Sequence, residues 1–440
     1  MMRVWMMPWV VVAIPFIGAA FTPLLWTSLY RMKSLVLSAV AVTLLAVTGL
    51  SWALNEPFDG MPFMWLLPLA AFFSLLGQPL HQDNRAAWLM TLILLGSGLG
   101  ILTAQGPIRH ILLAALLGVL CWLIYRHQVY HRQNGVRADV WRGLGSYAVG
   151  LASAVLALVL PASLSSVANL IVCATLLPLF PLHSGFIAVL TGLPGNLPAF
   201  LVLLLPALGF HSLLLLLPNL TVTILHTAAL LALAGASYGS LRALIQPRAL
   251  PRLSYGGLAF FSVLWWYVAD TTTAPSQAVV YLSAVGLAMS GLLLAWYSLR
   301  ARYGDIDARA FGGLVYSMPR FSTLLVLLAL AALGMPPFGV FSGFMGMLLN
   351  PAFTPSGSFA VIMIVWFCAS WYFMDWVQEL VFGRPRSDIR HEDLRRTEWA
   401  SLFMLLLLLL VLGTAPSRLF QAGAVTPPAS VASQSVTWTR

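Results

Sequence analysis

The sequence predicts an all-α polytopic membrane protein with about fourteen transmembrane helices. Two observations carry this prediction. Of the 440 residues, 60% are hydrophobic and only 8% are charged, and the mean hydropathy is +0.90, a balance that soluble domains do not have. The apolar residues also fall into runs near the ~20 residues that a helix needs to cross a bilayer.

In chain order, we expect helices at 6–30, 34–54, 61–80, 87–104, 108–125, 141–161, 166–183, 199–217, 220–245, 254–269, 278–299, 321–349, 358–382 and 399–413. The first run follows Arg3 and has no small-residue cleavage site. It is also longer than the core of a signal peptide, so we expect it to be retained as a helix. The tail at 414–440, rich in Ser, Thr, Ala and Pro, is expected to be a flexible exterior segment.

The basic residues supply the predicted orientation. They gather at alternate connections between the apolar runs, namely Arg31 and Lys33; Arg126, Arg132, Arg137 and Arg142; Arg242, Arg248 and Arg252; Arg300, Arg302, Arg309 and Arg320; and Arg384, Arg386, Arg390, Arg395 and Arg396. The positive-inside rule makes these loops cytoplasmic and leaves both termini outside. Topology therefore explains the net charge of +10, and we expect lipid rather than nucleic acid as the partner.

Motifs for chemistry are missing from the sequence. It has no nucleotide-binding loop, no dinucleotide fingerprint and no nucleophile motif in a plausible context. Cys121, Cys173 and Cys368 lie in separate apolar runs and are expected to pack there, without metal or disulfide. We therefore expect no cofactor, no metal and no enzymatic activity in this chain alone. Any activity should be transport, or should belong to a partner.

Two apolar runs contain helix breakers. The stretch 176–218 carries prolines at 178, 181, 194, 198 and 206, with His183 among them, and a second run contains Gly334, Pro336 and Pro337. A helix interrupted at membrane depth leaves backbone groups unpaired, which lipid cannot satisfy. Such breaks occur inside protein or beside a water-filled cavity, where transporters place ion paths. The breaks thus predict either a working ion path or the shell of one.

The motif Leu176-Leu177-Pro178-Leu179-Phe180-Pro181-Leu182-His183 resembles the broken seventh helix of the antiporter-like proton-conducting subunits of complex I and of Mrp-type cation/proton antiporters. In that family the motif reads Lys-x-Pro-x-x-Pro-Leu-His. Further segments that resemble the family occur before and after this motif, in the same order as in the family, at Phe58-Asp59-Gly60, 99–104, 237–255, 312–319 and 334–338. The resemblance extends over most of the chain.

The resemblance implies a fold and an organisation. It implies two inverted five-helix repeats with broken helices 7 and 12, in a single membrane domain spanning 1–440. Its parts would be N-terminal helices at 1–104, a first repeat at 108–245, a second repeat at 254–382, a last helix at 399–413 and the tail at 414–440. It also implies a multi-pass protein of the bacterial inner (cytoplasmic) membrane.

The buried charges of the family's proton path are absent. Alignment with the family pattern puts neutral residues at the charged positions of helices 5, 7, 8, 11 and 12, namely Ala115, Leu176, Ala207, Ser290 and Phe344. The single lysine, Lys33, lies in the predicted first loop. A lysine has to be buried to carry protons at neutral pH, so a lysine relay is not available here.

The polar residues that remain give the candidate sites. His183, His211, His226 and Ser290 are the candidates for a residual proton path or polar core, although a structural hydrogen bond is the favoured reading for each histidine. Asp375 and Glu379 are four residues apart and share a helix face, as an ion-binding pair or as a surface ion pair near Arg384. Arg109 and His110 are expected to extend to the membrane surface.

Three functions remain open from the sequence, and the least favoured is an independent anion carrier that uses Arg109 or the half-helix N-termini at the breaks. The first is a scaffold or coupling subunit of a multi-subunit proton- or cation-translocating complex, whose degenerate path is complemented by an intact paralogue. The alternative is a membrane partner of a soluble, zinc-containing carbonic-anhydrase-like subunit in an inorganic-carbon uptake complex. Arginine-rich cytoplasmic loops would suit such a soluble partner, although topology alone explains them.

Overall fold

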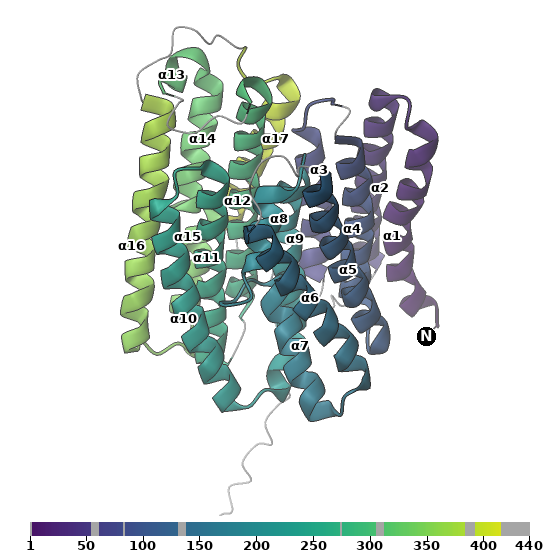
Figure 1. The fold of residues 1–440 in the computed structure, drawn as a ribbon, viewed down its shortest axis with the longest axis vertical. Coiled ribbons are helices and arrows are strands. Elements are labelled where there is room, and N and C mark those ends of the chain that lie inside the picture. The colour runs from purple at the N-terminus through teal and green to yellow at the C-terminus, as the bar shows by residue number, and fades with distance from the viewer. Residues whose placement is uncertain are drawn as a thin grey trace, which may run out of the picture.

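The computed structural model describes residues 2–53, 61–81, 84–130, 138–272, 275–304, 312–382 and 392–414. Within these ranges the regular structure is helical, and the long helices run roughly alongside one another (Figure 1). Ten described helices are long and apolar enough to cross a membrane, and four shorter apolar helices accompany them. The chain is therefore a multi-pass membrane protein, and the count of fourteen spans stays a prediction.

The helices of the first half are α1 (Met2–Phe21), a 3-10 turn (Thr22–Leu25), α2 (Leu29–Ala53), α3 (Met61–Leu76), α4 (Arg85–Thr103), α5 (Pro107–Tyr130), α6 (Ala138–Val159), α7 (Ala162–Leu176), α8 (Ser184–Gly192) and α9 (Leu197–Leu216). Those of the second half are a 3-10 turn (Leu217–Asn219), α10 (Val222–Ile245), α11 (Ala249–Thr271), α12 (Ser276–Tyr303), α13 (Leu314–Ser317), α14 (Pro319–Ala332), α15 (Gly339–Leu348), α16 (Gly357–Val377), a π-helical turn (Gln378–Phe382) and α17 (Arg396–Thr414).

Both predicted breaks occur. The predicted span at 321–349 is two helices, α14 and α15, separated by residues 333–338. The predicted span at 166–183 ends early, because the helix stops at Leu176 before Pro178. Pro178 has no N–H to donate within a helix. A second helix, α8, then begins at Ser184, and this helix was not predicted from the sequence.

Several basic residues expected in loops lie in helices, and Lys33 and Arg252 are two of them. Helix α2 begins at Leu29, so Lys33 belongs to its second turn. Helix α11 begins at Ala249, five residues earlier than predicted, so Arg252 belongs to its first turns and is buried. Pro251 in that first turn is a common helix-start residue, and it marks the true beginning of α11.

Helices α9 and α12 form the centre of the bundle. Both are apolar around their whole circumference, as helices surrounded by protein must be. Of the 18 residues in the most apolar stretch of each helix, 94% are buried in α12 and 83% are buried in α9. Close contact needs small residues here: a Cβ at Gly343 of α15 would lie 2.6 Å from the backbone of Tyr281 on α12. The broken helix α14–α15 therefore packs directly on the central helix.

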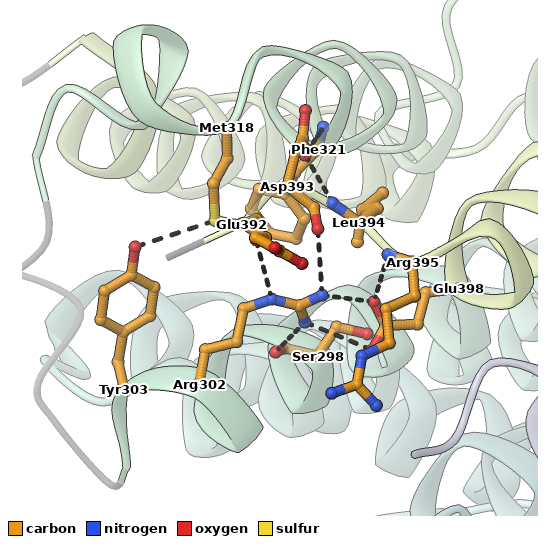
Figure 2. Close-up of polar contacts among 10 residues, drawn as sticks. All are labelled: Ser298, Arg302, Tyr303, Met318, Phe321, Glu392, Asp393, Leu394, Arg395 and Glu398. Carbon is orange, nitrogen blue, oxygen red and sulfur yellow. Dashed lines mark hydrogen bonds and ion pairs between the residues drawn. The ribbon is translucent and has the colours of Figure 1, made fainter. Parts of the chain in front are cut away.

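A buried ion pair joins the ends of α12 and α17 (Figure 2). Arg302 Nη2 lies 2.5 Å from Glu398 Oε2, and their side chains are 12% and 3% exposed. Arg302 also donates to the carbonyls of Ser298, Glu392 and Asp393. The Glu398 carboxylate accepts the backbone N–H of Arg395, as in the capping box of a helix N-terminus. We call this network the Arg302 clamp.

The Arg302 clamp reaches two further helices. The carboxylate of Asp393 accepts the backbone N–H of Phe321 (Figure 2) and also that of Arg320, which caps the start of α14. One turn further along α17, Ser401 Oγ donates to the carbonyl of Phe73 in α3 at 2.7 Å. The clamp and this bond tie the last helix to helices from both halves of the chain. Nearby in the first half, Lys33 Nζ donates at 2.5 Å to the carbonyl of Gln78, just beyond the end of α3.

We expect Glu398→Ala to lower the free energy of unfolding by about 3 kcal/mol, because it leaves the Arg302 guanidinium enclosed without its partner. Unfolding of the purified protein in mixed micelles, followed by circular dichroism against rising SDS, would measure this change.

Glu392→Ala is the matched control. The side chain of Glu392 is exposed, and only its backbone carbonyl bonds to Arg302. Equal destabilisation by the two variants would contradict the importance of the ion pair.

Candidate functional site

The first break separates α7 from α8 at residues 177–183 and contains Pro178 and Pro181. The N–H of Leu177 still bonds to Cys173 O at 2.8 Å, and that of Leu179 bonds to Ala174 O at 3.1 Å. The carbonyl of Leu177 accepts a hydrogen bond of 3.0 Å from the indole Nε1 of Trp265 on α11. A tryptophan therefore satisfies backbone that the proline interruption would leave unpaired.

The second break, at residues 333–338, contains Gly334, Pro336 and Pro337 and repeats this pattern. The N–H of Leu333 bonds to Ala329 O, and that of Met335 bonds to Leu330 O. The carbonyl of Leu333 accepts a hydrogen bond of 2.9 Å from Trp366 Nε1 on α16. Gly334 has a φ of +75°, and a Cβ there would lie 2.6 Å from the Trp366 ring. A glycine is required for the indole to reach the break.

His183 is the N-cap residue of α8 and is 9% exposed. Its ring stacks on Phe180 with 5.6 Å between centroids and lies 5.3 Å from the ring of Tyr238 on α10. Tyr238 in turn contacts Tyr255 of α11, and the Arg242 guanidinium lies over both tyrosine rings. Among the described residues, His183 Nδ1 has no hydrogen-bond partner. His183 thus lies at the inner end of an aromatic cluster, with an arginine at the other end.

Most of the residues at the positions where the family pattern has charges are buried in the packed interior. Leu176, Ala207 and Ser290 are fully buried, and Phe344 is 3% exposed, whereas Ala115 is on an exposed face of α5. Phe344 stacks on Trp366 with 4.2 Å between ring centroids. Tyr281 and Phe260 contact this pair, and Phe373 stacks on Phe260. We call these five residues the aromatic plug, because they fill the space beside the second break.

The other candidate path residues lie apart from His183. His211 is buried on α9, and Ser290 is buried on α12, and neither His211 Nδ1 nor Ser290 Oγ has a partner among the described residues. His226 is exposed on α10, where its electrostatic neighbour is Asp270. Within the described part of the chain, no recorded contact links His183, His211, His226 and Ser290 to one another.

Asp375 and Glu379 share a cationic partner, Arg252, that was not predicted from the sequence. Arg252 Nη1 lies 3.3 Å from Asp375 Oδ2 and 3.6 Å from Glu379 Oε2. The Arg252 side chain is 3% exposed, whereas those of Asp375 and Glu379 are 46% and 25% exposed. Arg252 Nε also donates to the carbonyl of Gln246, at the end of α10. Arg384, the expected partner of the acids, lies outside the described residues.

Three groups of important side chains were missed from the sequence: the indoles of Trp265 and Trp366, the guanidinium of Arg252, and the Arg302–Glu398 pair. For the tryptophans, nothing local in the sequence indicates that two of them reach helix breaks. For Arg252, the signal was Pro251, because a proline is common in the first turn of a helix and here indicates that α11 begins before Arg252. For Glu398, its place three residues after the N-cap position is a recognisable capping signal.

Comparison with known proteins finds similarity to membrane subunits of respiratory complexes. No protein-family model matches the chain. It is 28% identical over 201 residues to NADH-quinone oxidoreductase subunit M of Escherichia coli (strain K12), covering 44% of this chain and 38% of the relative. With subunit M of Rickettsia typhi it shares 25% identity over 258 residues, or 56% of this chain and 51% of the relative. Each match therefore extends over about half of the curated relative or less.

Solved structures share the fold over nearly the whole chain. A chain of respiratory complex I from Thermus thermophilus with bound NADH matches with a TM-score of 0.77, at 20% identity, over 95% of this chain and 98% of that chain. A chain of the membrane-bound sulfane sulfur reductase, an archaeal respiratory membrane complex, matches with a TM-score of 0.78, at 15% identity, over 94% and 95%.

The sequence relatives and the shared fold agree with the motifs around the two helix breaks. The resemblance predicted from the sequence is confirmed: the relatives by sequence are M subunits of NADH-quinone oxidoreductase, and the chain shares its fold with chains of complex I and of an archaeal respiratory membrane complex.

Proposed function

We propose that this chain is a non-conducting subunit of a proton-translocating respiratory-type complex in the bacterial inner membrane. In this role it provides scaffold or coupling between neighbouring membrane subunits, and an intact paralogue carries the protons. Its arginine-rich loops face the cytoplasm and its termini face outward, following the positive-inside rule. The observation that carries the proposal is the aromatic plug, which fills the place of a charged site with Phe344 stacked on Trp366.

Both breaks support this proposal through their hydrogen bonds. Proton conduction through a protein interior needs a chain of titratable groups or ordered water. Here the carbonyls of Leu177 and Leu333 are bonded to indole N–H groups, which cannot take up or release a proton near neutral pH. The breaks keep the architecture of an ion path without its chemistry.

The first experiment measures conduction directly. We expect proteoliposomes containing the chain alone to show proton and sodium flux no greater than that of empty liposomes. A pH-sensitive dye under an imposed potassium diffusion potential would report the flux, with a protonophore as the positive control. A robust flux that His183→Ala abolishes would contradict the proposal, because it would require a working path at the first break.

A second experiment tests whether the site at the first break is dry. We expect Leu176→Lys to destabilise the protein by at least about 3 kcal/mol, because an ammonium there has neither water nor a carboxylate partner. Leu176→Met is the matched control and should cost less than about 1.5 kcal/mol. SDS titration would measure both variants. If Leu176→Lys were tolerated like Leu176→Met, the site would be hydrated and the proposal of a dry path would fail.

The partners can be identified by gentle solubilisation. We expect the tagged chain to co-purify with other membrane subunits, including a paralogue that keeps the buried lysines, as measured by mass spectrometry. A zinc-bearing soluble subunit, measured by metal analysis, would instead support the alternative of inorganic-carbon uptake.

A further inference from the structure

The second break brings non-helical backbone to the surface of the chain. Residues 335–337 are all exposed, and Met335 is 50% exposed. At the first break only Pro181 is exposed, and the carbonyl of the residue after it accepts a hydrogen bond from Ser146 on α6. The two breaks therefore differ in how much of their backbone the chain itself covers.

The hydrogen bonds of the second break leave two carbonyls open. The carbonyl of Leu333 accepts an indole N–H, and that of Met335 accepts the N–H of Phe338 at 3.1 Å. The carbonyls of Gly334 and Pro336 accept no hydrogen bond from the residues that the structure describes. Two acceptors beside exposed backbone thus have no partner in that part of the chain.

The second break lies at the depth of the hydrocarbon core. A Cβ at Gly339, directly after the break, would lie 3.0 Å from the Cβ of Ala284 on α12. Helix α12 has 28 residues, so it is about 42 Å long, and Ala284 lies about 12 Å from its start at Ser276. A core of about 30 Å centred on α12 would begin about 6 Å from that start. The break is therefore inside the region where lipid offers no hydrogen-bond donor.

Two helices of the chain already contact the second break, but neither supplies a donor to the open carbonyls. Trp366 of α16 approaches so closely that a Cβ at Gly334 would lie 2.6 Å from its ring, and its single N–H is used by Leu333. Gly413 of α17 lies against the carbonyl of Pro337, where there is no room for a side chain. The described neighbours are thus exhausted as donors.

Uncovered backbone at this depth is tolerated only beside water or beside protein. An ordered water needs two to four polar partners, and the side chains of residues 335–337 are apolar. Cover by protein requires a partner, because the described part of the chain leaves these residues exposed. The surroundings of the break therefore favour a second protein over water.

We propose that residues 335–337 are the contact site for a transmembrane helix of a neighbouring membrane subunit, and that this helix donates a side-chain hydrogen bond to the carbonyl of Gly334 or Pro336. Serine, threonine, asparagine, glutamine and tryptophan are suitable donors, because each can lie in a bilayer without a charge. The inference rests on the proposed function only for the presence of neighbouring subunits. Its test measures contact at Met335 and not proton flux.

Photocrosslinking in the native membrane tests this contact. In the full-length chain, p-benzoylphenylalanine would replace Met335 or, as the matched control, Val42 of α2, which is also 50% exposed. Helix α2 lies far across the bundle from α16 (Figure 1). After irradiation of intact membranes, we expect position 335 to link to another membrane subunit, and mass spectrometry to find a donor side chain in the linked peptide. Position 42 should not give this adduct.

A bulky side chain tests whether the contact is closely packed. We expect Met335→Trp to reduce the amount of co-purified subunit about tenfold, because overpacking weakens a packed contact. Val42→Trp should leave that amount unchanged. Since Met335 is exposed in this chain, the isolated Met335→Trp protein should unfold at the same SDS concentration as the unaltered protein, which separates a lost contact from misfolding.

The inference is overturned if position 335 links only to lipid or to a second copy of this chain, if it links to no protein, or if the linked segment contains no donor side chain. Equal effects of Met335→Trp and Val42→Trp would also overturn it. These failures leave the proposed function standing as long as membrane subunits co-purify. Proton flux through the chain alone would instead refute that function and leave the contact intact.

Discussion

The structure depends on the rule that backbone polar groups in a bilayer must be satisfied within the protein. Both broken helices challenge this rule, and each meets it with a tryptophan from a different helix, Trp265 at the first break and Trp366 at the second. The indole is well suited to this task because it donates one hydrogen bond and otherwise presents an apolar surface. The packing around the breaks follows from it, including the glycine at 334 that makes room for the ring.

The same solution explains how charges could disappear from an ion-conducting architecture. Prolines at a break free a carbonyl whether or not a lysine lies nearby, so the break needs a partner in every family member. Where water and charge provide that partner, the region is hydrated and conduction remains open. In the non-conducting role proposed for this chain, an aromatic donor provides it, and neighbouring positions such as Phe344 are large and apolar. On that proposal, architecture and conduction are separable in this fold.

The sequence predicted the helical membrane architecture, the two breaks and the family, since each depends on local signals such as apolar runs and prolines. The sequence did not predict the features that depend on contacts between residues far apart in the chain. Helix α8 was missed because Pro194 and Pro198 made the whole region look irregular. Arg252 and Lys33 were placed in loops because basic residues usually mark them, but a carboxylate pair and backbone carbonyls stabilise these two cations within helices. The indole bonds are invisible to any local pattern, because Leu177 and Trp265 meet only in the folded protein.

The Arg302 clamp has a consequence for how the protein is made. Its acidic partner Glu398 and the hydroxyl of Ser401 lie in the last helix, whereas Phe73 and Lys33 belong to helices that leave the ribosome early. Arg302, at the end of α12, is synthesised before its carboxylate partner, so its guanidinium lacks Glu398 until α17 arrives. A chain interrupted before α17 would leave that enclosed cation without its anion.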